Sequence, residues 1–166
     1  MLKYLGKKFF VNLIIVISIF GLDRVSKNYV INLSKNIDAS FLPLTKYLNI
    51  SLTWNEGIAF GLFSFNEIFS YNLMTFFILI VIIIILIMVT KNTGLRQLSL
   101  LIIFGGAIGN LYDRIYFNAV PDFIDFHVGN FHWFIFNVSD IFITLGVLLM
   151  ITLELIGYKK ETDEKI

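Results

Sequence analysis

The chain has 166 residues, of which 57% are hydrophobic and 15% are charged, and its mean hydropathy is +0.81. A soluble domain of this length carries more charge, so the composition predicts one integral membrane domain over residues 1–166. The net charge of +1 argues against a nucleic-acid partner, and the absence of cysteine excludes disulfides, thiol nucleophiles and thiolate metal sites.

The N-terminal region places three lysines before an apolar run over residues 9–22, as a signal peptide does. A polar segment that contains Asp23 and Lys27 follows this run, where a signal peptide has small residues for cleavage. We therefore expect an uncleaved first membrane helix over about 9–30.

Residues 34–67 form the longest stretch without a long apolar run. Hydrophobic and polar side chains alternate over 50–55, which is typical of a strand, and Asn55-Glu56-Gly57 is a turn signal. Residues 58–61 then return as a second expected strand. The pattern predicts a small β-sheet at the membrane surface.

The remaining apolar runs predict three more spans, at about 68–90, 97–116 and 139–158, with an outer loop over 117–138. At about 1.5 Å per residue, a helix of this length crosses a hydrocarbon core of about 30 Å. The fold class expected is a mainly α membrane protein, with four transmembrane helices and a small extracytoplasmic β-sheet cradle.

Four spans place both termini and the 91–96 connection on one side of the membrane. Eight cationic residues lie on that side: Lys3, Lys7, Lys8, Lys91, Arg96, Lys159, Lys160 and Lys165. Five lie on the other: Arg24, Lys27, Lys35, Lys46 and Arg114. Because cytoplasmic loops carry the excess of Lys and Arg, we expect cytoplasmic termini and an external sheet and 117–138 loop.

Four of the twelve carboxylates lie between residues 105 and 140, where two apolar segments meet. Charge in such a place is costly and usually functional. Asn110, Asp113 and Arg114 have the spacing i, i+3 and i+4, so they share one helical face. Either Asp113 and Arg114 form a snorkelling interfacial pair, or this face holds a lipid phosphate or a peptide carbonyl.

Two further pairs have a helical spacing. Asp23 and Lys27 are four residues apart and can pair, either as an interfacial ion pair or as a brace for the outer site. Gly105 and Gly109 form a small-xxx-small pattern, which in a membrane helix permits the close approach of a neighbour.

Asp122 and Asp140 lie on either side of an aromatic-rich loop. Alone, Asp122 reads as a solvated loop residue and Asp140 as a charge at a helix N-terminus. Together, they are two carboxylates that the loop can bring close enough to share a proton. Such a pair activates water, because one carboxylate takes its proton while the other protonates or polarises the carbonyl.

Other catalytic chemistries have weaker support in the sequence. His127 and His132 lie near Asp125, but their spacing matches no helical metal motif and no His-Glu-x-x-His occurs. No Gly-x-Ser-x-Gly motif indicates a serine nucleophile. We predict neither a metal nor a cofactor.

Taken together, these motifs resemble the lipoprotein signal peptidases, the signal peptidase II family. Five blocks follow the family's order: Asp23–Lys27, Asn55–Gly61, Gly105–Arg114, Val120–Asp125 and Phe136–Asp140. Two residues depart from its pattern. Arg24 stands where glutamine is usual and can alter the Asp23–Lys27 contact, and Ser139 stands where alanine is usual and can cap the helix or hydrogen-bond Asp140.

The resemblance implies an intramembrane aspartyl endopeptidase of the bacterial cytoplasmic (inner) membrane, which cleaves diacylglyceryl-prolipoproteins immediately before the lipidated cysteine. It implies Asp122 and Asp140 as catalytic residues. The supporting or substrate-binding residues it implies are Asn55, Gly57, Asn110, Asp113, Arg114 and Asn137, with Asp23 and Lys27. It further implies contact with membrane lipids, a monomer, no nucleic acid and inhibition by cyclic peptide antibiotics of the globomycin type.

Two alternatives remain open at this point. A small membrane carrier or proton-coupled transporter would use the aspartates as a proton relay, but such proteins usually place charges near the midplane and in repeated halves. A lipid-binding scaffold accounts for Arg114 but leaves Asp122 and Asp140 without a role.

Overall fold

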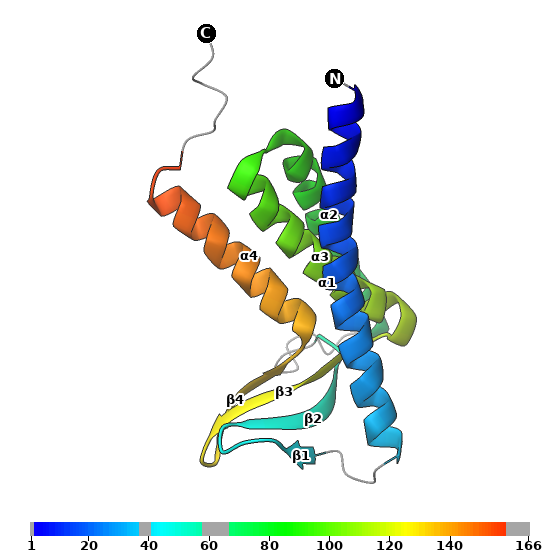
Figure 1. The fold of residues 1–166 in the computed structure, drawn as a ribbon. Coiled ribbons are helices and arrows are strands. Elements are labelled where there is room, and N and C mark those ends of the chain that lie inside the picture. Colours follow the sequence, from blue (N-terminus) through cyan, green and yellow to red (C-terminus); the bar gives the residue numbers. More distant parts are fainter. Residues whose placement is uncertain (1, 37–40, 58–66, 159–166) are drawn as a thin grey trace.

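The computed structural model describes residues 2–36, 41–57 and 67–158. These residues form α1 (Leu2–Asn36), β1 (Phe41–Pro43), β2 (Leu48–Asn55), α2 (Glu67–Lys91), α3 (Gly94–Phe117), β3 (Val120–Val128), β4 (Phe131–Phe136) and α4 (Val138–Leu155) (Figure 1). Each of the four helices in the described part is long and apolar enough to cross a membrane. The predicted fold class is confirmed.

The sheet differs from the sequence prediction in its strands. Its order is β1-β2-β3-β4, with every neighbouring pair antiparallel, so most of the expected 117–138 loop is a β-hairpin. The loop prediction was wrong because β3 carries polar side chains on both faces, which removes the hydrophobic alternation of a half-buried strand. The strand expected at 58–61 lies outside the described residues.

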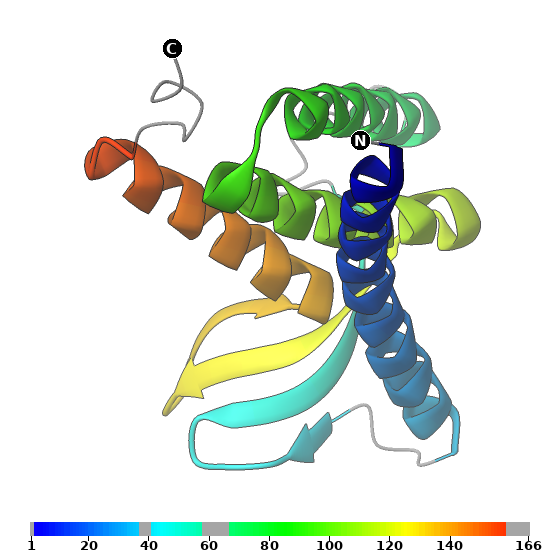
Figure 2. The same cartoon turned by 45° about the horizontal axis from the view of Figure 1, so that its top comes forward.

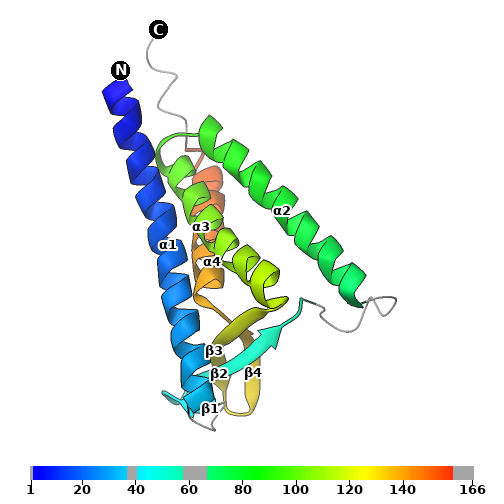
Figure 3. The same ribbon diagram turned by 90° about the vertical axis from the view of Figure 1, so that its right-hand side faces the viewer.

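Helix α3 is the centre of the bundle. Half of the residues in its most apolar 18-residue segment are buried inside the protein, against 11% for α1 and α2 and 17% for α4. It lies beside α1 and α4, and α2 covers another side of it, away from α4 (Figures 2 and 3). Small residues allow this, since a Cβ atom at Gly105 would lie 3.0 Å from Ile19 of α1. The close approach predicted for the Gly105–Gly109 pattern is confirmed.

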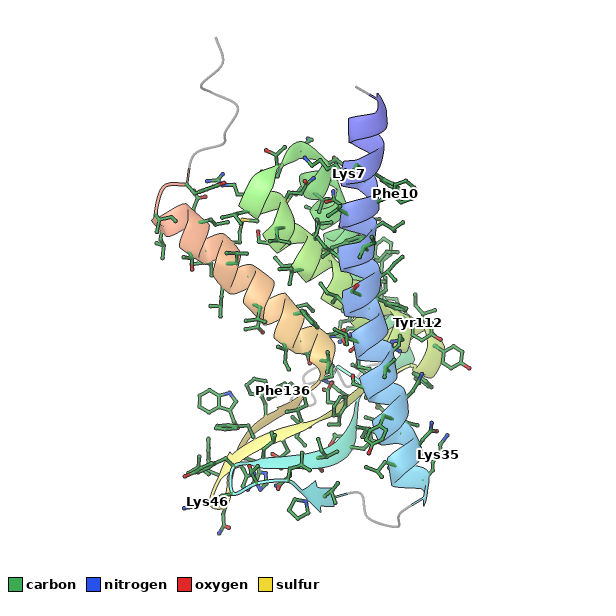
Figure 4. The ribbon with its side chains drawn as sticks, viewed as in Figure 1. Lys7, Phe10, Lys35, Lys46, Tyr112 and Phe136 are labelled. Atoms are coloured by element: carbon green, nitrogen blue, oxygen red, sulfur yellow. The ribbon has the colours of Figure 1, made fainter. Side chains whose placement is uncertain are left out.

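The long axis of the molecule separates two ends. The start of α1, the α2–α3 connection and the end of α4 lie at one end, and the sheet lies at the other (Figure 1). Lys7 marks the first end, whereas Lys35 and Lys46 lie at the sheet end (Figure 4). Helix α1 continues well past the expected 9–30, so its last turns run alongside the sheet.

Candidate active site

A buried charge cluster joins α1 to α3. Asp23, Lys27 and Asp113 are each fully buried. Lys27 Nζ donates to Asp23 Oδ1 at 2.9 Å and to Asp113 Oδ2 at 2.6 Å. The pair therefore lies inside the helix bundle, between α1 and α3, rather than on its exposed surface. Removing Lys27, or both carboxylates, would leave buried charge with too few partners of opposite sign.

Arg24 completes the charge balance of this cluster. Its two terminal nitrogens donate to the two carboxylate oxygens of Asp113, and it also donates to Asp23. The guanidinium carbon lies 4.7 Å from the ring centroid of Tyr112. Two cations therefore face two carboxylates. The Asp23–Lys27 contact is kept beside Arg24, which adds a two-pronged contact that a neutral side chain could not make.

Asn110 links the buried charge cluster to Asp140 through hydrogen bonds. Its side-chain oxygen accepts from Lys27 Nζ at 2.9 Å, and its amide nitrogen donates to Asp140 Oδ1 at 2.7 Å. Asp113 faces α1, whereas Arg114 lines a cavity and donates to the Asn110 carbonyl at 3.3 Å. Of the two alternatives for this helical face, the Asp113–Arg114 pair is wrong, because Asp113 takes its partners from α1.

Asn137 holds both candidate catalytic carboxylates. Its side chain donates to Asp122 Oδ1 at 2.6 Å, and its backbone N–H donates to Asp140 Oδ2 at 3.0 Å. The same side chain accepts from the Asp140 backbone N–H at 3.1 Å, which makes Asn137 and Asp140 a capping box at the start of α4. Asp140 is thus both a helix N-terminal charge and a neighbour of Asp122.

The last residue of β2, Asn55, supplies the second donor to Asp122. Asn55 Nδ2 donates to Asp122 Oδ2 at 2.9 Å, while Asn55 Oδ1 accepts from the Gly57 backbone N–H at 2.8 Å. Gly57 has a φ of +78°, and a Cβ atom there would overlap the end of Met74. Glycine suits both conditions, so the turn can aim Asn55 at the carboxylate.

Burial raises the pKa of the Asp122 carboxyl above its ordinary value of 3.8. The amide donors of Asn137 and Asn55 oppose this shift, and the negative charge of Asp140 adds to it. The side chain is only 4% exposed, so desolvation of the charged form is the main cause. Burial therefore favours the protonated form of Asp122.

A cavity of about 690 Å³ opens beside Asp122. Polar and apolar groups from three strands and two helices line it: Thr53, Trp54, Asn55, Glu56, Gly57, Met74, Arg114, Asp122 and Ile135. Arg114 Nε has no hydrogen-bond partner within the described part of the chain. The cavity therefore combines a carboxyl, a guanidinium and an apolar wall, whereas the unpartnered Arg114 Nε is itself buried.

Asp125 does not belong to this site. It follows Asp122 by three positions on β3, and residues an odd number apart on a regular strand point to opposite faces. It is 2% exposed and contacts His132 and Asn49 instead. Desolvation acts to raise the pKa of Asp125, but the hydrogen bonds from His132 and Asn49 outweigh it and lower this pKa below 3.8.

Two features escaped the sequence analysis. Arg24 was treated only as a departure from a pattern, although its partner Asp113 lies 89 positions away. Ser139 neither caps the helix nor hydrogen-bonds Asp140. Its hydroxyl has no partner among the described residues and packs against Gly109. Lys27 faces two carboxylates, so one negative charge needs a second cation, and Arg24 supplies it.

The fold and site define a multi-pass membrane protein with a polar, carboxylate-bearing site at one end of a helix bundle. The signal peptidase II family model matches residues 15–156, and the chain belongs to this family. A lipoprotein signal peptidase of Pelagibacter ubique (strain HTCC1062) is 46% identical over 159 residues, 96% of each protein. That of Anaplasma marginale (strain Florida) is 35% identical over 154 residues, 90% of this chain and 87% of the relative.

Solved structures agree with this membership. Two structures described as bacterial membrane enzymes align with a TM-score of 0.69 each, at 27% and 30% identity. They cover 94% and 90% of this chain, and 94% of their own chains is covered. The chain is thus an aspartic peptidase of a bacterial membrane with prolipoproteins as its substrate class. The carrier and scaffold alternatives fall away.

Proposed function

We propose that this enzyme cleaves diacylglyceryl-modified prolipoproteins immediately before the lipidated cysteine, with a water molecule activated by Asp122 and Asp140. One observation carries the proposal. Asn137 hydrogen-bonds Asp122 through its side chain and Asp140 through its backbone N–H, so one residue fixes both carboxylates. The cavity that Asp122 lines gives a peptide bond access to this carboxyl group.

The surroundings of the two carboxylates suggest different roles. Asp122 is buried with a raised pKa, so it carries the proton at the start. Asp140 accepts hydrogen bonds from Asn110 Nδ2 and the Asn137 N–H, which hold its carboxyl group in place, and we assign it the role of the base. Asp140 takes a proton from water as the oxygen attacks the scissile carbonyl, and Asp122 protonates the carbonyl oxygen.

The tetrahedral intermediate then collapses. The C–N bond breaks, the leaving amine takes the proton held by Asp140, and the hydroxyl proton returns to Asp122. The new carboxyl ends the released signal peptide, and the amine belongs to the lipidated cysteine. Each carboxyl is back in its first protonation state, so one water is consumed for each bond cleaved.

The cavity wall supports the assignment of the substrate. Trp54, Met74 and Ile135 provide apolar contact for acyl chains or signal-peptide side chains, and the Arg114 guanidinium provides a cation for a peptide carbonyl or lipid phosphate. A cyclic peptide antibiotic of the globomycin type would inhibit by occupying this cavity. The enzyme works as a monomer, surrounded by membrane lipids.

We further propose that the sheet and the dyad face the external side of the membrane. The excess of Lys and Arg at the end that holds the start of α1 supports cytoplasmic termini. Water then reaches the dyad from outside, and the signal-peptide helix of a prolipoprotein approaches through the bilayer.

The dyad is tested with Asp122→Asn, Asp140→Asn and the double variant, purified in detergent and assayed on a lipidated prolipoprotein. Each single change should lower cleavage by about 10²–10⁴-fold, the usual contribution of a general acid or base. The double variant should be scarcely worse than either, because the shared proton needs both groups. Substantial turnover by either folded single variant would contradict the aspartyl mechanism.

The matched control is Asp125→Asn. It makes the same chemical change on the same strand, but at a buried carboxylate that contacts His132 and Asn49 rather than the cavity. This variant should retain far more activity than the dyad variants. Thermal melting of every variant separates loss of chemistry from loss of folding, and a loss of activity in folded Asp125→Asn as deep as in Asp122→Asn would contradict the assignment.

A further inference from the structure

A second group of chemically active side chains lies on the sheet, separate from the dyad. Asp125 and His127 are two positions apart on β3, and His132 of β4 is the cross-strand partner of His127. Each of the three offers a nitrogen or oxygen ligand atom, and these atoms lie within 4.8 Å of one another. Where the strand pairing shifts, the additional residue falls on β2 or β4, so β3 alternates regularly and turns this group away from the face of Asp122.

The contacts within the group are those of a built site. His132 Nδ1 lies 2.9 Å from both oxygens of Asp125, and Asn49 Nδ2 lies 3.2 Å from Asp125 Oδ2 and 3.1 Å from His127 Nδ1. The two imidazole rings stack, with centroids 5.2 Å apart and planes 19° apart. Asp125 is 2% exposed, whereas His132 is exposed at the mouth of the group.

An ordinary ion pair explains only part of this arrangement. It accounts for Asp125 with His132, but it leaves His127 stacked on the other imidazole with its Nδ1 facing an amide. Two imidazoles and a carboxylate converging from one side form the donor set of a borderline divalent transition metal, with further positions open to water. The three ligands lie on two strands of a hairpin, so the absence of a helical metal motif does not exclude a site here.

We propose that Asp125, His127 and His132 bind a divalent transition-metal ion of the zinc class. Metal–nitrogen and metal–oxygen bonds of about 2.0–2.2 Å require the ligand atoms to draw in slightly, which side-chain rotation allows while the strand pairing stays fixed. Asn49 then hydrogen-bonds the coordinating carboxylate from outside. The ion joins β3 to β4 close to the hairpin turn, which projects away from the helices (Figure 1).

The site is structural rather than catalytic. The dyad lies on the other face of β3 and at the far end of β4, where the chain passes through Asn137 into α4. A metal tie near the turn stabilises the hairpin against opening without contacting a reacting group. Its ligands come from two strands, so binding also contributes to the stability of the folded sheet.

The test uses the full-length protein in detergent, with any affinity tag removed and after treatment with a chelator. Zinc chloride is titrated by calorimetry, with magnesium chloride as a hard cation of similar charge. We expect one Zn²⁺ per chain, no comparable magnesium binding, and a rise in melting temperature with Zn²⁺. The His127→Gln/His132→Gln double variant should lose the site, and Asp125→Asn should weaken it at least tenfold.

Asp122→Asn is the matched control, because it changes a buried carboxylate on the same strand but the opposite face. It should bind Zn²⁺ as the parent does. Absence of stoichiometric binding, or binding of equal affinity in the histidine double variant that melts cooperatively, would overturn the proposal. Loss of prolipoprotein cleavage on chelation, restored by Zn²⁺, would overturn the structural role. Neither result depends on whether the dyad mechanism is correct.

Discussion

Packing is tight beside the site at Gly109, where α1, α3 and α4 meet. A Cβ atom there would overlap Ser139 Oγ and lie 2.8 Å from Asp23 Oδ2. Neither neighbour has room to retreat, since both are fully buried and the Ser139 N–H donates to Asp23 Oδ1 at 3.0 Å. Gly109→Ala should therefore push α1 or α4 away from α3 by about 0.5–1 Å.

The expected cost follows from overpacking. An extra methyl group in a filled interior costs about 1–3 kcal/mol, and each kcal/mol lowers the melting temperature of a domain of this size by about 2–4 °C. The loss of cleavage should exceed the loss that reduced stability alone would cause. Displacement of Asp23 moves Lys27, and Lys27 holds Asp140 through Asn110. A misplacement near 1 Å can cost about 10²-fold in rate.

Melting in detergent and cleavage of a lipidated prolipoprotein measure the two effects. Gly21→Ala on α1 is the matched control, because no heavy atom lies within 4 Å of its added Cβ, and alanine favours the helix. Adding Ser139→Ala to Gly109→Ala removes the overlapping hydroxyl and should recover part of both losses. Gly109→Ala with the melting temperature and cleavage rate of the parent would contradict this packing, as would equal losses in Gly21→Ala.

Three further outcomes are expected. The raised pKa of Asp122 means that the folded state binds more protons than the unfolded state just above pH 3.8, so the free energy of unfolding contributed by this group falls as pH rises through that window. The melting-temperature advantage of the parent over Asp122→Asn should shrink accordingly, and an advantage that grows with pH would contradict it. Arg114→Ala should raise KM with little change in melting temperature, because Arg114 lines the cavity and makes no ion pair among the described residues. Unchanged KM and kcat would leave it without a substrate role. Arg24→Gln should lose about 1.5–3 kcal/mol of stability, since charged hydrogen bonds to Asp113 disappear, yet retain cleavage because Lys27 still holds Asn110; an unchanged melting temperature would show that the guanidinium contributes nothing.

Features that depend on local periodicity were predictable from the sequence. Long apolar runs specify membrane helices by length alone, and the small-residue pattern at Gly105 and Gly109 predicted close helix contact. The Asp23–Lys27 pair followed from its four-residue spacing. Their burial did not follow, because it depends on α3 covering that face of α1.

Features that depend on distant partners were not predictable. The hairpin of β3 and β4 was taken for a loop, since Asp122 and Asp125 place polar groups on both faces of one strand. A strand with polar side chains on both faces is stabilised by the hydrogen-bond partners that lie against each face. Asn137 and Asn55 satisfy Asp122 on one side, and His132 satisfies Asp125 on the other.

The position of Asn137 explains how a two-layer protein can hold a two-carboxylate site. Asp122 belongs to the sheet and Asp140 to the bundle, so their separation depends on the angle between the layers. Asn137 is the single residue between β4 and α4, and it contacts both carboxylates while capping the helix. A rotation of the sheet against the bundle would therefore strain the hydrogen bonds at this residue. Because Asn110 and the buried cluster hold Asp140 from the opposite side, the junction is fixed from both layers.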